Sequence, residues 1–130
     1  MILAIVIAAI VSFAVGALWY GPVFGKTWMK LMNFTPESMK AMSMTPARAM
    51  TLGFISQLVF AGVLAQFVLA VDMGVWVAMT LAFWIWLGFY ATTTLGGYLW
   101  EGKSCKLVAF NMAYQLVGLL VTAAVLGALL

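Results

Sequence analysis

The residues of this chain that could do chemistry are uncharged amides and hydroxyls set within apolar stretches. Asn111, Gln115 and Thr122 recur at helical spacing, so one helix face would carry all three, with Tyr114 beside them. Gln57 lies in the middle of an earlier apolar stretch. These groups form hydrogen bonds but bring no charge, so they suit polar contacts between helices better than strong ion binding or proton transfer.

Two interpretations of these polar residues are open. An amide in an apolar interior is costly unless it is paired, and a hydrogen bond between helices in a membrane returns about 0.6–2 kcal/mol. The first interpretation is a polar clasp that fixes helix register, in which Gln57 bridges Asn111 and Gln115. The second is the lining of a pathway for water or a small solute. The candidate network consists of Gln57, Asn111, Gln115, Tyr114 and Thr92.

The composition argues against several classes of function. Histidine is absent, which removes the commonest general base and metal ligand. The single cysteine excludes a disulfide within the chain and the usual thiolate metal sites. The three carboxylates lie far apart in sequence, so a paired acid–base site is not expected. We therefore expect no enzyme activity, no cofactor and no metal site, and no nucleic-acid partner.

The elements that must position the polar residues are long apolar stretches. Hydrophobic residues make up 67% of the chain and charged residues 7%, outside the range of soluble domains. No charged residue lies within residues 2–18, 49–71, 75–99 or 107–130, and each stretch is close to the length that crosses a bilayer as a helix. The sequence predicts an all-α integral membrane protein: one four-helix bundle over residues 1–130, with spans at about 2–20, 47–71, 75–99 and 106–130.

Charged residues between the stretches indicate an orientation. The first connection contains Lys26, Lys30, Lys40 and Arg48, the third contains Lys103 and Lys106, and the second contains only Asp72, in a predicted tight turn. With four spans, the first and third connections share one side. The positive-inside rule then predicts that both termini are non-cytoplasmic, in a cell membrane that we take to be a bacterial inner membrane.

The first connection, residues 21–46, has a helical pattern of its own. Aromatic residues Phe24 and Trp28 share a face opposite Lys26 and Lys30, which predicts a short helix in the membrane interface. Further helix starts are predicted at Thr35-Pro36 and Thr45-Pro46, where a capping residue precedes proline. The predicted interfacial anchors are Trp19, Tyr20, Trp28, Lys26, Lys30 and Trp100.

Small residues at four-residue spacing predict close helix packing. The candidate stripe consists of Ala8, Ser12 and Gly16 in the first span and Gly88, Thr92 and Gly96 in the third. We expect these two spans to pack on each other or on a second copy. The leading functional hypothesis is a non-enzymatic module in the lipid bilayer that packs with itself, as a homo-oligomer, or with another membrane protein. The alternative is an oligomeric small-solute channel or transporter.

Three segments resemble a family of small membrane proteins catalogued as domain of unknown function 1761. They are GALWYGPVFGKTWMKLM at residues 16–32, GYLWEGK at 97–103 and NMAYQLV at 111–117. They occur in the expected order and extend over most of the chain. The resemblance implies a multi-spanning membrane fold, and it carries over no catalytic or binding residue.

Overall fold

The computed structural model describes residues 1–35, 37–38, 45–71 and 74–130. The predicted turn at Asp72, the proline of the predicted start at Thr35-Pro36 and the basic residue Lys40 lie outside these ranges. In chain order the helices are α1 (Ile2–Leu18), a wider π-helical segment η1 (Trp19–Val23), α2 (Gly25–Met32), α4 (Pro46–Leu69), α5 (Val75–Ile85), a second π-helical segment η2 (Trp86–Ala91), α6 (Thr92–Trp100) and α7 (Cys105–Leu129).

The predicted fold class is confirmed. Among the described residues, four helical segments are long and apolar enough to cross a membrane: Ile2–Val23, Ala47–Leu69, Val75–Trp100 and Cys105–Leu129. Helix α2 supplies the short helical connection expected after the first span. The predicted start of the second span is also confirmed, because Thr45 Oγ1 accepts a hydrogen bond from the Arg48 N–H at 3.3 Å. Within the described ranges the chain forms no β-strand.

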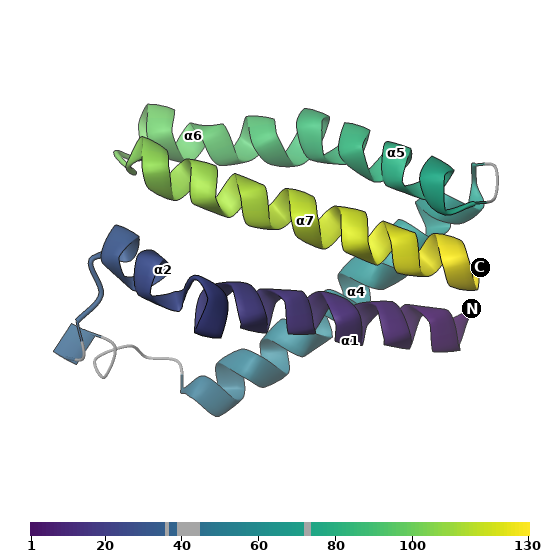
Figure 1. Cartoon of the computed structure of the whole chain (residues 1–130), viewed down its shortest axis with the longest axis horizontal. Helices are drawn as coiled ribbons and strands as arrows, with labels where there is room; N and C mark the ends of the chain where they lie inside the picture. The colour runs from purple at the N-terminus through teal and green to yellow at the C-terminus, as the bar shows by residue number, and fades with distance from the viewer. Residues whose placement is uncertain (36, 39–44, 72–73) are drawn as a thin grey trace.

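Helix α7 is the centre of the arrangement. It packs against α1 on one side and against α5 and α6 on the other, while α4 crosses the others obliquely (Figure 1). The first and third spans are therefore separated by α7, which differs from the direct pairing expected within one chain. The physical reason is that α7 has small residues of its own. A Cβ atom on Gly127 would lie 3.0 Å from both Ala78 Cβ and Val75 Cα, so the missing side chain lets α5 approach closely.

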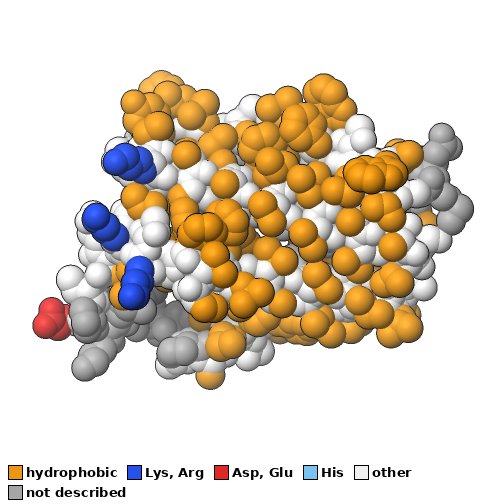
Figure 2. Space-filling view, in the orientation of Figure 1, with side chains coloured by type: hydrophobic (Ala, Val, Ile, Leu, Met, Phe, Trp, Pro, Cys, Tyr) orange, Lys and Arg blue, Asp and Glu red, His pale blue; other side chains and the backbone are white. Residues whose placement is uncertain are grey.

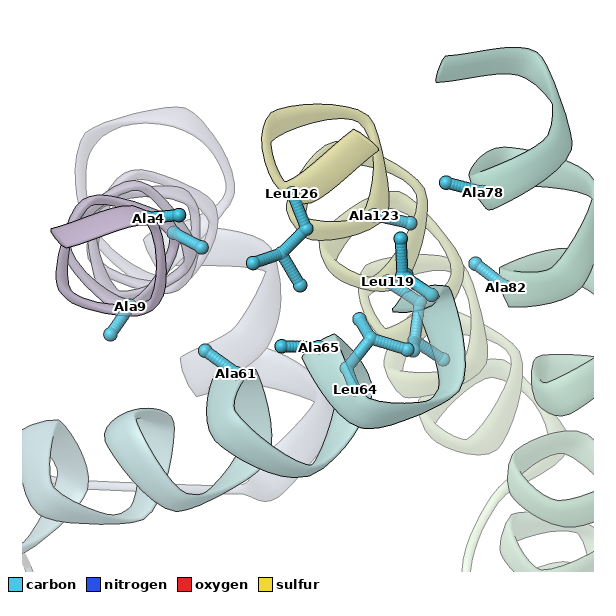
Figure 3. Close-up of a cluster of buried hydrophobic side chains, with 12 residues drawn as sticks. Ala4, Ala9, Ala61, Leu64, Ala65, Ala78, Ala82, Leu119, Ala123 and Leu126 are labelled. Atoms are coloured by element: carbon cyan, nitrogen blue, oxygen red, sulfur yellow. The ribbon is translucent and has the colours of Figure 1, made fainter. Parts of the chain in front are cut away.

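The half of the molecule that contains both termini is closed by a dry core. Figure 3 shows alanine and leucine side chains from α1, α4, α5 and α7 converging there. The buried cluster consists of Ala4, Ala8, Ala9, Ala61, Leu64, Ala65, Val68, Ala78, Ala82, Leu119, Ala123 and Leu126. Most members are alanines, which let helix backbones come close and form many van der Waals contacts. We call this part the terminal half.

The opposite half contains η1, α2, α6 and the first turns of α4 and α7, and we call it the basic half. On the face shown in Figure 2, the blue Lys and Arg side chains gather at this end. The first span breaks here, because Gly21 is non-helical (φ −108°, ψ −111°) and Pro22 cannot continue the hydrogen-bond ladder. Helix α2 ends at Asn33 in the left-handed conformation (φ 57°). The bend lets α2 turn away from the line of α1.

Candidate functional site

The polar residues of the four spans form hydrogen bonds between different helices. In three of these bonds a hydroxyl group on one segment donates to an amide oxygen on another: Ser12 to Gln57 at 2.6 Å, Tyr20 to Asn111 at 2.9 Å, and Thr94 to Gln115 at 3.0 Å. They connect α1 with α4, η1 with α7, and α6 with α7. A fourth bond, from the Trp86 indole N–H to the Met112 carbonyl at 3.0 Å, connects η2 with α7.

The single clasp expected around Gln57 is wrong in its partners. Gln57 bonds to Ser12, while Asn111 and Gln115 each bond to a hydroxyl on another segment. The reason is the oblique course of α4. This helix joins the core through Ala61, Leu64 and Ala65, and then diverges from α6 towards its first residues (Figure 1). Gln57 is therefore placed against α1.

Thr92 does not join the polar network. Its side chain is exposed, and its Oγ1 donates to the Gly88 carbonyl of its own helix at 2.8 Å. Gly88 is exposed as well, and a Cβ atom built on it would meet nothing within 4 Å. This part of the predicted packing stripe thus faces outward. In α1, by contrast, Ala8 and Ser12 are buried.

An aromatic cluster surrounds the Tyr20–Asn111 bond. Ring centroids of neighbouring members lie 4.6–6.1 Å apart, and the members are Trp19, Tyr20, Phe24, Phe110 and Tyr114. The predicted anchors Trp19 and Tyr20 therefore pack inside the basic half, and Trp28 lies against Tyr20 at 5.2 Å. Trp100 is 87% exposed. The Trp19 indole Nε1 is buried and has no hydrogen-bond partner among the described residues.

Two cavities lie between these elements. The larger, which we call the vestibule, has a volume of about 760 Å³ and is walled by side chains of α1, α2, α4 and α7, with Trp28, Met50 and Lys103 among them. The smaller, which we call the inner cavity, has a volume of about 160 Å³ and is lined by Ser12, Ser56, Gln57, Tyr90, Tyr114 and Gln115, among others. Its wall at Leu119 is part of the dry core.

The cavities share walls, and the shared residues are the polar ones. Gln57 and Tyr114 line both the vestibule and the inner cavity. Gln115 lines the inner cavity and a third cavity of about 370 Å³, which reaches Asn111 and Lys103. Each of the three amides thus accepts a hydrogen bond from a hydroxyl group and also lines a cavity.

This arrangement offers hydrogen bonding and aromatic surface. In the part of the chain that the structure describes, no three histidine, cysteine or acidic side chains gather as a metal site would require. The sequence analysis did not predict that Tyr20 and Thr94 donate hydrogen bonds to Asn111 and Gln115. It also did not predict that Tyr90 lines the inner cavity. Tyr20 could have been found, because it follows Gly16 by four residues and so shares the face of the α1 stripe. The π-helical turn η2, which lies between Trp86 and Thr94, has no comparable sequence signal.

Comparison with known proteins identifies a family. Residues 3–127 match the family described as "Protein of unknown function (DUF1761)", so the chain belongs to it, as the three sequence segments predicted. No curated protein and no solved structure matches the chain. The family description assigns no activity, so the proposal for function must come from the geometry of the site.

Proposed function

We propose that this member of the DUF1761 family is a non-enzymatic membrane protein that binds a small amphipathic molecule in the cavities of its basic half. One observation carries the proposal: the vestibule and the inner cavity are both lined by two polar side chains from different helices, Gln57 on α4, which is hydrogen-bonded to Ser12, and Tyr114 on α7. Sites for small ligands commonly measure about 300–1,000 Å³, with mostly apolar walls and a few placed polar groups. The vestibule matches both features.

The closed terminal half favours binding over conduction. Towards the termini the inner cavity is bounded by Leu119, which belongs to the dry core, so a solute moving in that direction would meet packed alanine and leucine side chains. A transporter is the second candidate, favoured by the three adjoining cavities whose lining residues extend from Lys103 to Ser12. Transport would require the terminal half to open, whereas binding requires no such change.

We also propose that the protein is a homo-oligomer that associates through the outer face of α5 and α6. Gly88 and Thr92 point away from their own chain, and beside them Trp84 and Phe89 are 62% and 71% exposed. Small residues flanked by large ones form a groove into which a second helix can pack closely. This contact would leave the cavities on the other side of α5 and α6 unchanged.

The proposed location is a cell membrane, a bacterial inner membrane, with both termini non-cytoplasmic. The described basic residues lie near the ends of the spans that are opposite the two termini (Figures 1 and 2). They are Lys26, Lys30, Arg48, Lys103 and Lys106. The positive-inside rule places that end in the cytoplasm. The vestibule would then face the cytoplasmic leaflet.

Native mass spectrometry of the protein extracted from membranes in mild detergent tests the binding proposal. We expect a bound molecule of low mass on the wild-type chain. Gly118 lines the inner cavity, with Tyr114 Cε1 4.0 Å from its ideal Cβ, so Gly118→Leu should occupy this cavity of about 160 Å³ and remove the adduct. The control Gly88→Leu, which adds its side chain outside the cavities, should retain it. Wild-type protein without an adduct, or an adduct equally present on Gly118→Leu, would contradict the proposal.

A further inference from the structure

We infer that the guest is an acyl-chain lipid with a small, uncharged, hydrogen-bond-accepting headgroup, and that it reaches the inner cavity sideways from the bilayer between α4 and α5. This inference rests on the proposed function, since it names the molecule bound and its route. It follows from three features of the inner cavity and its surroundings: which polar groups remain free, which charges are present, and where the cavity opens.

The inner cavity offers donors. The side-chain oxygens of Gln57 and Gln115 already accept hydrogen bonds from Ser12 and Thr94. The side-chain N–H2 groups of Gln57 and Gln115 have no hydrogen-bond partner among the described residues. Both groups are accessible rather than buried, because in those ranges the buried side-chain nitrogen without a partner is that of the Trp19 indole. The lining hydroxyls of Ser56, Tyr90 and Tyr114 can donate as well as accept, so a guest that accepts hydrogen bonds, such as an ester or ketone oxygen, finds a donor in each of these groups.

The inner cavity carries no charge to match an ion. Its described lining contains hydroxyl, amide, aromatic and aliphatic side chains, and no acidic or basic one. A charged headgroup would lose its hydration there without a counter-ion, at a cost that membrane interiors rarely support. Its volume of about 160 Å³ is below the range of about 300–1,000 Å³ that is common for sites of small ligands. The headgroup must therefore be both uncharged and small, which excludes the headgroup of a phospholipid.

Next to the inner cavity lies an apolar opening, which we call the lateral window. The window has a volume of about 520 Å³ and lies between α4 and the α5–η2 segment, with Val59, Val63, Phe67 and Ile85 in its walls. It shares Ser56, Phe60, Tyr90 and Leu119 with the inner cavity.

The window faces outward from the helices. Val59, Val63 and Phe67 are 62%, 53% and 53% exposed, so they meet whatever surrounds the helices. In a membrane this surrounding medium is the hydrocarbon of the lipid chains. Described charged residues are absent from the window walls. An acyl chain can therefore remain in contact with the bilayer at the window while its headgroup occupies the inner cavity.

Photo-crosslinking of the full chain in lipid nanodiscs tests this inference. The probe is a hexadecanoic acid methyl ester with a photoactivatable diazirine at the end of its chain. We expect labelling of α4 and α5 around the window that an excess of unlabelled methyl ester prevents. Val63→Trp should obstruct the window and abolish the labelling that competitor prevents. If Val63→Trp folds poorly, Val59→Trp should give the same result. Val77→Trp on α5, outside the described cavities, should leave the labelling unchanged.

Two charged probes separate the possible failures. The same chain with a free carboxylate or with an ammonium group should give no competed labelling at the window. If a charged probe instead labels the vestibule in a competed manner, the inference is overturned while the proposed function stands. If no probe gives labelling that competitor prevents while the wild-type chain still carries an adduct in native mass spectrometry, the inference alone is overturned. If the adduct is absent as well, both are overturned. Labelling by the ester that Val63→Trp and Val59→Trp leave intact would show ordinary contact with surrounding lipid and would also overturn the inference.

Discussion

The phenol of Tyr114 on α7 occupies the space that a side chain at position 16 on α1 would need. A Cβ atom on Gly16 would lie 2.9 Å from Tyr114 Oη, closer than such atoms approach in folded proteins. Tyr114 lines both the vestibule and the inner cavity. The absence of a side chain at Gly16 therefore positions the ring that stands between the two cavities, and the small-residue stripe of α1 serves the site as well as helix packing.

Replacing Gly16 with alanine should displace Tyr114, so this variant should be less stable than Gly88→Ala. The added methyl group meets the far end of a side chain, so its cost should lie at the low end of overpacking, about 1 kcal/mol, which offsets the gain of about 0.5–1 kcal/mol that alanine brings to a helix. Gly88→Ala is the matched control, because its new methyl group meets nothing and a helix gains about 0.5–1 kcal/mol from replacing glycine with alanine. Unfolding by SDS titration in mixed micelles measures both. Equal stabilisation of the two variants would contradict the assigned contact.

The hydrogen bond from Ser12 to Gln57 should appear as coupling between the two residues. A double-mutant cycle with Ser12→Ala and Gln57→Leu should give an interaction energy of about 0.6–1.7 kcal/mol, the range found for such bonds in membranes. A second cycle with Gln57→Leu and Asn111→Leu should be additive, because these residues have different partners. Coupling in the second cycle and additivity in the first would restore the single clasp around Gln57.

Self-association should depend on the outer face of α5 and α6. Gly88→Leu should shift the protein towards monomer, because the new side chain keeps the second helix from approaching. Gly53→Leu, which points into the vestibule, should leave the oligomeric state unchanged. Light scattering in mild detergent, corrected for bound detergent, measures the mass of the protein. A wild-type monomer, or an oligomer that Gly88→Leu does not alter, would argue against this interface.

The orientation in the membrane can be measured with reporters fused after Leu130. The termini lie at the end opposite the described basic residues, so a reporter active only outside the cytoplasm should work there. A reporter active only in the cytoplasm should be silent at the same position. The reverse pattern would show that both termini are cytoplasmic and would place the vestibule on the outer side.

The positions of the membrane-length helices could be predicted from the sequence, but which helices pack against each other could not. Uncharged apolar stretches predict membrane-length helices because charge is costly in hydrocarbon, and Thr45-Pro46 predicts a helix start because its chemistry is local. The position of α7 between α1 and α5 depends instead on how small residues such as Gly127 compete for the same partners. Periodicity shows which residues share a face, but it does not show which helix lies opposite.

The same limit explains what was missed in the site. The amides Gln57, Asn111 and Gln115 were found because polar residues stand out in apolar stretches. The hydroxyl groups that bond to these amides could not be identified from the sequence. Serine, threonine and tyrosine hydroxyls also bond to their own helix, as Thr92 does, or lie at the membrane interface. Thr94, two residues later, faces α7 beyond the π-helical turn η2 and bonds to Gln115.

The central claim is that the basic half of this protein contains occupied cavities walled by Gln57 and Tyr114. An experimental structure of the wild-type chain, crystallised in a lipidic mesophase after mild extraction from its membrane, tests it most directly. The account predicts ordered non-protein density in the vestibule or the inner cavity, in contact with these side chains, while the alanine-rich terminal half remains dry. A structure in which α4 closes against α6 and α7, so that Gln57, Asn111 and Gln115 pack without a cavity, would contradict it.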